Sequence, residues 1–182
     1  MAWPSERSRH GGVDEIPLPD GPGRLWLCGK HLVGPDVEAA LASVGASTVV
    51  CLNEPHELRD RYPDYVAWLA RNQPDRAMWH PVPDLHAPDV PDARALADEI
   101  RCRLAQGEGV LVHCGAGIGR TGTIAIAVLL AMGVPLDVAS RTVADHRPMA
   151  GPEAGAQTEL VIALARAHAV DGEAGTGDEP DP

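Results

Sequence analysis

The chain has 182 residues, of which 45% are hydrophobic and 23% are charged, proportions that are ordinary for one soluble globular domain of α/β size. They exclude a wholly disordered or fibrous chain. The formal net charge is −11 and Lys30 is the single lysine, so the overall field disfavours nonspecific binding to nucleic acid or to anionic lipid. Phenylalanine is absent, which leaves aliphatic side chains to fill most of the core.

The two ends of the chain differ in composition from its middle. Residues 1–22 are polar and interrupted by proline and glycine, which predicts a flexible arm, and residues 171–182 are acidic and poor in apolar side chains, which predicts a disordered tail. One domain is expected between them, over residues 23–170. The longest apolar stretch, residues 124–134, is far below the ~20 residues that span a bilayer. The start of the chain also lacks the apolar run of a signal peptide, so a cytoplasmic location is expected.

Within the domain, predicted strands and helices alternate. Short, mostly apolar runs indicate strands at residues 24–28, 48–52 and 109–113. A further short strand is predicted at residues 78–82, where Pro81 makes it irregular or peripheral. Apolar residues at helical spacing indicate helices at residues 36–44, 62–71, 92–106, 121–132, 136–147 and 152–170, with Asp92 as a cap. This order predicts an α/β fold with a central, mostly parallel sheet flanked by helices.

The cysteines are Cys28, Cys51, Cys102 and Cys114, and they show no C-x-x-C pair or other metal-ligand spacing. Without a secretory signal they are expected to be free thiols rather than a disulfide framework. The histidines likewise form no metal spacing. Neither a metal site nor a cofactor is expected.

The segment HCGAGIGRTGT at residues 113–123 is the most informative part of the chain. It joins a predicted strand to a helix that is apolar almost all round, so a glycine-rich turn leads into a helix N-terminus. Such a turn points successive backbone N–H groups and the positive helix end at one place, which suits a phosphate. The predicted phosphate-binding residues are Gly115, Ala116, Gly117, Ile118, Gly119 and Arg120.

Two side chains in this segment add chemistry to the cradle. Arg120 carries a planar guanidinium that can bind two phosphate oxygens at once. Cys114 stands at the start of the loop, below the expected phosphorus atom, where the same N–H groups and helix end stabilise a thiolate. A phosphate cradle with a thiolate at its base is the arrangement of a nucleophilic phosphatase site.

Three other interpretations of this segment compete with that one. The run GIGRTG satisfies the dinucleotide pattern GxGxxG, with Asp137 twenty residues after Gly117. However, Pro135 interrupts the region before Asp137, and too little chain follows for a full Rossmann sheet. A Walker A loop requires a Gly-Lys-Ser/Thr ending, and this loop has no lysine. A merely buried thiol at Cys114 leaves the residues around it unexplained.

The pattern H-C-x₂-G-x₂-R-T-G resembles the signature of the cysteine-dependent protein tyrosine phosphatase superfamily, and the short chain favours its dual-specificity-like branch. The matching residues are His113, Cys114, Gly117, Arg120, Thr121 and Gly122. The resemblance covers roughly residues 23–169 and implies the protein tyrosine phosphatase-like fold. It also implies that His113 organises the loop through hydrogen bonds and that the Thr121 hydroxyl stabilises the departing thiolate.

The segment HPVPDLHAPD at residues 80–89 resembles the general-acid loop of that superfamily, with Asp84 at the position of the acid, thirty residues before Cys114. The chemistry requires such a group because the leaving alkoxide or phenoxide needs a proton as the P–O bond breaks. Asp89 and Asp92 are nearby substitutes. The alternative role for Asp84 is that of a solvated turn aspartate.

Further along the chain, Arg147-Pro148 followed by Gln157 resembles the superfamily's R-P…Q stretch, in which the glutamine places water for the second chemical step. An exposed residue near the start of the last helix is the alternative for Gln157. Glu54 and Glu57 are both candidates to pair with Arg120, and the sequence does not choose between them.

Cys51 lies near the end of the predicted strand at residues 48–52, and Cys114 follows the predicted strand at residues 109–113. Cys51 resembles the backdoor cysteine of some relatives. A disulfide between the two requires Cα atoms within ~7 Å. The alternative is that Cys51 is a core thiol that packs into the sheet.

Together these residues predict a cysteine-dependent phosphomonoester hydrolase, a protein-tyrosine or dual-specificity phosphatase that forms a thiophosphate (phosphocysteine) intermediate without a metal. The predicted catalytic residues are Cys114, Asp84, Arg120, Thr121 and Gln157. The expected partner is a phosphorylated protein, because the loop lacks the lysines by which phosphoinositide-preferring members resemble one another; nucleic acid and membranes are not expected. The alternatives are a catalytically silent phosphoprotein-binding module on the same fold, which needs no acid, and a rhodanese-like sulfur transfer enzyme, which explains neither Arg120 nor Asp84.

Overall fold

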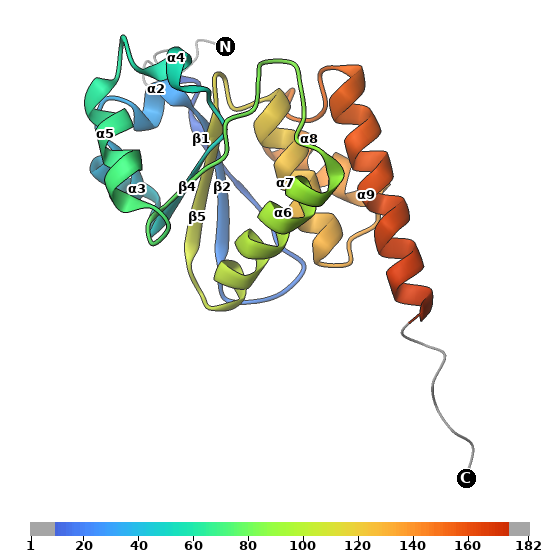
Figure 1. The fold of residues 1–182 in the computed structure, drawn as a ribbon. Coiled ribbons are helices and arrows are strands. Elements are labelled where there is room, and N and C mark those ends of the chain that lie inside the picture. The colour runs from blue at the N-terminus through green and yellow to red at the C-terminus, as the bar shows by residue number, and fades with distance from the viewer. Residues whose placement is uncertain (1–9, 175–182) are drawn as a thin grey trace, which may run out of the picture.

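A central sheet of five strands organises the chain, whose computed structural model describes residues 10–174. In spatial order the strands are β1 (Val13–Ile16), β2 (Arg24–Gly29), β5 (Gly109–Cys114), β3 (Thr48–Cys51) and β4 (Ala77–Trp79). The β1–β2 pair is antiparallel and the other neighbouring pairs are parallel (Figure 1). The predicted central, mostly parallel sheet flanked by helices is confirmed.

Strand β5 occupies the middle of the sheet because its sequence, GVLVHC, is mostly apolar on both faces and is buried along its whole length. The register places Gly29 of β2 beside Cys114 and places Cys51 of β3 beside His113. The carboxyl ends of three parallel strands therefore meet at one edge of the sheet, which is the place where α/β folds bind ligands.

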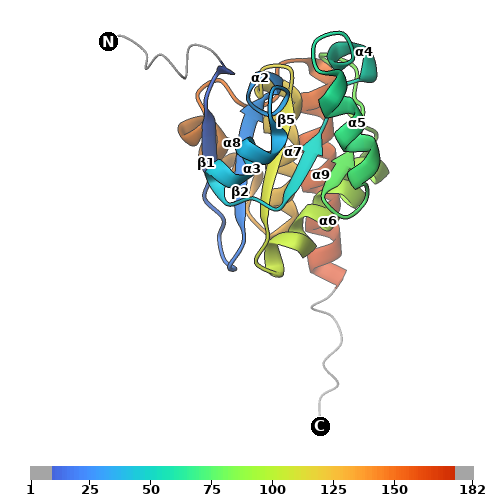
Figure 2. The same ribbon diagram turned by 90° about the vertical axis from the view of Figure 1, so that its left-hand side faces the viewer.

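Helices cover both faces of the sheet (Figures 1 and 2). One face carries α6 (Val90–Ala105), α7 (Gly119–Ala131), α8 (Leu136–His146) and α9 (Gly155–Ala174). The other carries α2 (Lys30–Val33), α3 (Val37–Val44), α4 (Pro55–Leu58) and α5 (Pro63–Asn72). Helix α7 is buried on nearly all sides, as its run of apolar residues requires. Among the described helices, none is long and apolar enough to cross a bilayer.

Helix α6 begins one turn earlier than the sequence predicts. Its N-cap is Asp89, whose side chain accepts a hydrogen bond from the backbone N–H of Asp92 at 2.9 Å. Pro91 occupies the first turn, where a missing N–H costs nothing. The predicted cap at Asp92 is therefore wrong, and the carboxylate of Asp89 is committed to the helix rather than to chemistry.

Residues 13–16, which the sequence places in a flexible arm, form strand β1 instead. Their backbone pairs with β2, and Ile16 is fully buried in the core. A four-residue strand with two acidic residues has almost no periodic signal, whereas the edge of β2 offers it backbone partners. Residues 171–174, predicted as part of the tail, continue helix α9. The remaining parts of the predicted arm and tail, residues 1–9 and 175–182, lie outside the described residues.

Candidate active site

The segment between β5 and α7 curls into a tight loop at the carboxyl edge of the sheet. Cys114 is the last residue of β5 and is 3% exposed, and α7 begins at Gly119. Gly117 has a φ of +75°, and a Cβ at this position would collide with the backbone carbonyl of Cys28, so the turn requires glycine. Ile118, which precedes α7, makes no side-chain cap. The first amides of the helix are therefore not occupied by their own N-cap residue and can meet an anion.

Arg120 projects from the first turn of α7 beside Gly115, and 3% of its side chain is exposed. Its two terminal nitrogens donate to the two carboxylate oxygens of Glu57 at 2.8 and 3.0 Å. This bidentate pair fixes the plane of the fork and decides between the two glutamates that the sequence left open. The Nε atom of Arg120 is buried without a protein partner among the described residues.

Glu57 is ionised at neutral pH. Its burial would raise the pKa, but the hydrogen bonds from Arg120 and from the backbone N–H of Glu54 outweigh that effect and lower the pKa to about 2. The short helix α4 places this carboxylate: Pro55 starts it, and Glu54 and Glu57 form a reciprocal capping box. The negative charge needed to hold Arg120 thus comes from a helix of a single turn.

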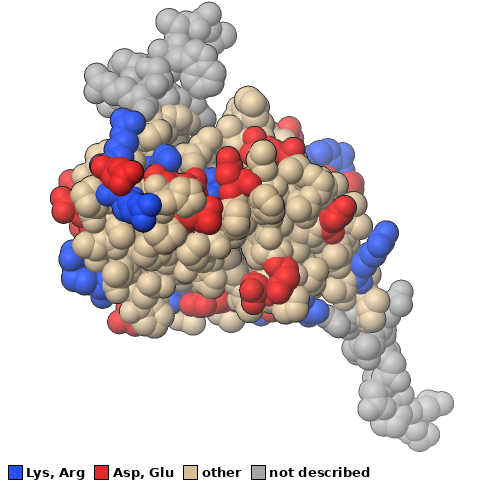
Figure 3. All heavy atoms as spheres, turned by 45° about the horizontal axis from the view of Figure 1, so that its top comes forward, with Lys and Arg blue, Asp and Glu red and all other residues tan. Residues whose placement is uncertain are grey.

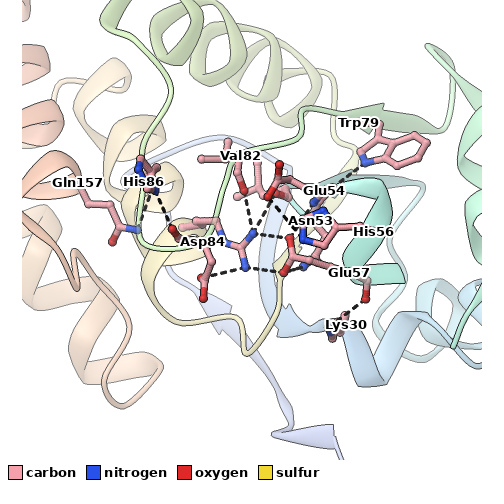
Figure 4. A network of polar contacts seen from close by, with 12 residues as sticks. Lys30, Asn53, Glu54, His56, Glu57, Trp79, Val82, Asp84, His86 and Gln157 are labelled. Atoms are coloured by element: carbon pink, nitrogen blue, oxygen red, sulfur yellow. Dashed lines mark hydrogen bonds and ion pairs between the residues drawn. The ribbon is translucent and has the colours of Figure 1, made fainter. Parts of the chain in front are cut away.

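Asp84 lies in the loop between β4 and α6, with Oδ1 3.1 Å from Nη2 of Arg120 (Figure 4). Its side chain is 73% exposed. The chain reaches this place because the segment after β4 continues beside β3, where Val82 donates its N–H to the carbonyl of Leu52 at 3.0 Å. The carbonyl of Val82 in turn accepts from Nη1 of Arg120 at 2.8 Å. The structure therefore brings Asp84 to Arg120, whereas Asp89 caps α6.

His113 is fully buried on β5, and its Nε2 lies 2.6 Å from the hydroxyl of Tyr65 on α5. Burial lowers the pKa of His113 to about 4, so the imidazole is neutral at neutral pH. A neutral, fully buried imidazole does not suit a general base. Nδ1 of His113 has no hydrogen-bond partner among the described residues, and the role of His113 in organising the loop remains a prediction. The sequence does not single out Tyr65, because an aromatic residue on the apolar face of a helix looks like ordinary core.

Gln157 is 1% exposed, which excludes the exposed-residue alternative. Its Oε1 accepts from the backbone N–H of Glu153 at 2.8 Å, and its Nε2 donates to the carbonyl of His86 at 3.1 Å (Figure 4). Nδ1 of His86 lies 2.8 Å from the carbonyl of Asp84. Gln157 thus connects helix α9 to the loop that carries Asp84. Its role in placing water remains a prediction.

Two further groups lie at the start of α7. The Thr121 hydroxyl is buried and has no partner among the described residues, which leaves it available for the role inferred from the family pattern. The carboxylate of Glu153 lies against Gly119, where an added Cβ would come within 2.9 Å of its Cδ. Nothing in the sequence marks Glu153, since an acidic residue in a loop is usually solvated.

Cys51 and Cys114 lie on neighbouring strands but on opposite faces of the sheet. Cys114 packs in the core shared with α6, α7 and α9, whereas Cys51 packs with Cys28 and the residues of α3 and α5. Burial raises the pKa of Cys51 to about 12. Cys51 is therefore a core thiol, and both cysteines are free.

The charge around the site is mostly negative. Figure 3, which brings the upper end of Figure 1 forward, shows acidic side chains spread over this face and basic ones mainly toward its margins. Lys30 donates its Nζ to the backbone carbonyl of Glu57 at 3.1 Å. Within residues 10–174, no group of three or more His, Cys, Asp or Glu is placed to hold a metal ion.

Residues 22–166 match a family model described as PTP-SAK, the Swiss Army Knife protein, DSP-PTPase phosphatase domain. The chain belongs to this family. A comparison with curated proteins finds no match.

Solved structures resemble this phosphatase-family domain over most of its length. Tk-PTP in its active form is 26% identical, with a TM-score of 0.64 over 81% of this chain and 93% of that chain. Kinase associated phosphatase with its catalytic-site cysteine replaced by serine is 20% identical, with a TM-score of 0.72 over 87% and 96% of the two chains. PTPMT1 in complex with PI(5)P is 17% identical, with a TM-score of 0.68 over 81% and 94%. The last two likenesses show the fold alone.

Proposed function

We propose that this protein hydrolyses phosphate monoesters with Cys114 as the nucleophile, as a protein-tyrosine or dual-specificity phosphatase. One observation carries the proposal: the buried guanidinium of Arg120 is held by Glu57, borders the loop that begins at Cys114, and meets Asp84. A nucleophile, a fork for phosphate oxygens and a proton donor thereby share one site. Membership of the phosphatase family supports the same reading.

In the first step, the Cys114 thiolate attacks phosphorus in line, and an S–P bond forms while the ester P–O bond breaks. Arg120 and the loop amides stabilise the equatorial oxygens, which carry most of the charge in a loose phosphoryl transition state. The incoming phosphate replaces Asp84 as the partner of Arg120. Protonated Asp84 then gives its proton to the leaving oxygen.

In the second step, water attacks the thiophosphate, and an O–P bond forms while the S–P bond breaks. Asp84 takes the proton of the water, inorganic phosphate leaves, and the Thr121 hydroxyl stabilises the returning thiolate. Gln157 holds the acid loop through His86 and is predicted to place the water. The thiolate and Asp84 supply the chemistry of both steps, so the scheme requires no metal.

Phosphoproteins are the substrate class that the charges of the site favour. The loop contains no lysine, and the single lysine of the chain, Lys30, hydrogen-bonds to the Glu57 carbonyl. A polyphosphorylated headgroup would bring several negative charges against Asp84, Glu153 and a net charge of −11. One phosphoryl group on a protein side chain needs only Arg120 and the loop amides.

The test is a hydrolysis panel with the purified 182-residue chain, in which release of inorganic phosphate is measured. The panel holds phosphotyrosine peptides, phosphoserine and phosphothreonine peptides, and phosphoinositides in micelles. We expect turnover of one or both peptide classes, and we expect Cys114→Ser to lose at least about 10⁴-fold in kcat while still binding the peptide. Substantial activity in Cys114→Ser would remove that residue from the mechanism. Binding without turnover by the wild type would favour the silent binding module, and turnover confined to phosphoinositides would overturn the substrate class.

A further inference from the structure

A second buried arginine, Arg147, binds the phosphate loop by its backbone carbonyls. It follows helix α8, and 4% of its side chain is exposed. Its Nη2 donates to the carbonyl of Ala116 at 2.9 Å, and its Nε donates to the carbonyl of Gly117. Arg147 therefore touches the loop itself, whereas Arg120 is held by Glu57 and by the acid loop.

These two contacts determine where the loop amides point. In a planar trans peptide the carbonyl and the following N–H point in opposite directions. Because the carbonyls of Ala116 and Gly117 are turned toward Arg147, the N–H groups of Gly117 and Ile118 point away from it. Successive N–H groups that point the same way form the concave surface that binds an anion.

The charge of Arg147 is balanced from the N-terminal strand. Asp14 on β1 places Oδ2 2.6 Å from Nη1 of Arg147, and 14% of the Asp14 side chain is exposed. The same Nη1 also lies 3.4 Å from the carbonyls of Gly12 and Leu27. Asp14 joins the site from a strand that precedes residues 22–166, the part of the chain that matches the family model.

We propose that Asp14 and Arg147 are positioning residues for the phosphate loop: the carboxylate on β1 orients the guanidinium, and the guanidinium turns the amides of Gly117 and Ile118 toward the phosphate. The inference rests on the proposed function in taking this loop as an anion cradle. Both residues act through the loop backbone. Without Asp14, the buried guanidinium of Arg147 loses its counter-ion and the carboxylate that orients it. An uncompensated buried charge of this kind is strongly destabilising.

Strand β1 carries a matched control beside Asp14. Glu15 pairs with Arg24 of β2 through hydrogen bonds of 2.8 and 2.7 Å, so its ion pair joins β1 to β2, whereas that of Asp14 joins β1 to the residue after α8. Its side chain is 38% exposed and that of Arg24 is 56% exposed. The pair lies at the surface and makes no contact with the loop in the described structure. Exposed pairs of this kind contribute little to stability.

The experiment compares Asp14→Asn with Glu15→Gln in the 182-residue chain. Steady-state kinetics, competitive inhibition by inorganic phosphate, direct binding of inorganic phosphate by calorimetry and the thermal unfolding midpoint are measured. Asp14→Asn should bind phosphate about 10- to 100-fold more weakly and lose kcat/KM by a similar factor, because a hydrogen bond to a charged group is worth that much. Asp14→Glu should recover part of the loss, and Glu15→Gln should match the wild type. If folded Asp14→Asn shows only a lower unfolding midpoint, with phosphate binding unchanged, or if Glu15→Gln loses as much, the proposal is overturned.

A second variant covers the case in which Asp14→Asn does not fold. Arg147→Lys keeps a positive charge opposite Asp14 but lacks the fork that reaches Ala116 and Gly117. Weaker phosphate binding in this variant supports the proposal, and wild-type phosphate binding contradicts it. Calorimetry also separates the two hypotheses: a wild-type chain that binds phosphate but hydrolyses no ester contradicts the proposed function, while the positioning role is still decided by the variants.

Discussion

The two buried arginines of the site, Arg120 and Arg147, are equally enclosed but differently satisfied. Their side chains are 3% and 4% exposed. Arg120 pairs with Glu57, faces the exposed carboxylate of Asp84, and keeps its Nε without a protein partner among the described residues. All three side-chain nitrogens of Arg147 donate to the protein, to Asp14 and to backbone carbonyls.

This difference indicates two roles at one loop: Arg120 is expected to bind a ligand, and Arg147 is expected to position the loop backbone. A buried donor without a partner is costly. The Nε of Arg120 is one of several such atoms in the described residues, and because Arg120 borders the loop that begins at Cys114, we expect a ligand on its side of the loop. The satisfied Arg147 marks the side that holds the loop in shape. Burial alone does not distinguish the two residues, whereas the accounting of their hydrogen bonds does.

The largest effect is expected from changing the arginine with the unpaired donor. Arg120→Lys should lower kcat/KM by about 10³-fold, because a single ammonium cannot reproduce the two-oxygen fork or the bidentate pair with Glu57. Arg147→Lys, which alters only the positioning, should lose about 10- to 100-fold. Steady-state kinetics of both variants on one phosphopeptide measures the difference. Equal losses would break the distinction between the two arginines.

The second-largest effect is expected from Asp84, the exposed carboxylate that lies beside Arg120. Asp84→Ala should lower kcat by about 10²-fold or more for a poor leaving group, because the leaving oxygen then departs without a proton. The loss should shrink along a series of aryl phosphates with increasingly good leaving groups. Asp89→Ala is the control, since that carboxylate caps α6. If Asp89→Ala shows the leaving-group dependence and Asp84→Ala does not, the general acid is misassigned.

A smaller effect is expected at Gln157, which connects α9 to the acid loop. Gln157→Ala should lower kcat by about tenfold, since the lost hydrogen bond to the His86 carbonyl loosens the loop that carries Asp84, which acts in both proposed steps. In the double variant with Asp84→Ala the two losses should therefore be less than additive. Rapid-mixing kinetics provides the check. A burst of the first product followed by slow turnover would show that the second step is slowed more than the first, as expected if Gln157 also places the water; an unchanged kcat would contradict both roles.

The smallest effect concerns His113, which is fully buried on β5 directly before Cys114. Burial lowers its pKa from 6.5 to about 4, so the folded state binds fewer protons than the unfolded state between these values. The contribution of neutral His113 to the free energy of unfolding is present above pH 6.5 and is lost as the pH falls toward 4. At pH 5.5 the free energy of unfolding is lower by about 1 kcal/mol. Urea unfolding at pH 7.5 and 5.5 measures it. His113→Gln should show a smaller difference between the two pH values, and an unchanged difference would contradict a neutral buried His113.

Much of the site could be predicted because its central part is local in sequence. Cys114, Gly117 and Arg120 fall within one strand–turn–helix segment, so backbone geometry alone brings the thiol, the amides and the fork together. The resemblance to the superfamily's general-acid loop also singled out Asp84, which the structure places beside Arg120; its role as the acid remains a prediction. The alternation of buried strands and helices likewise indicated the parallel sheet and placed β5 before the loop.

The groups that support the loop could not be predicted in the same way. Tyr65 meets His113 across 48 residues of sequence, and Asp14 meets Arg147 across 133 residues. Such pairs depend on the register of strands and on the direction of side chains, for which no local pattern exists. Strand β1 shows the same limit: four residues with weak periodicity become a strand only because β2 lies beside them.

The sequence by itself determined the fold class and the strand–turn–helix segment that carries Cys114 and Arg120, because these follow from residues that are neighbours along the chain; the roles of nucleophile and phosphate fork remain predictions. Only the tertiary structure decided that Glu57 rather than Glu54 pairs with Arg120. It also decided that Asp89 caps helix α6 and that Cys51 and Cys114 lie on opposite faces of the sheet. These outcomes depend on which face of a helix or strand a side chain occupies once the elements have packed. A change of one residue in register or one turn in helix start reverses them, and composition and spacing do not contain that information.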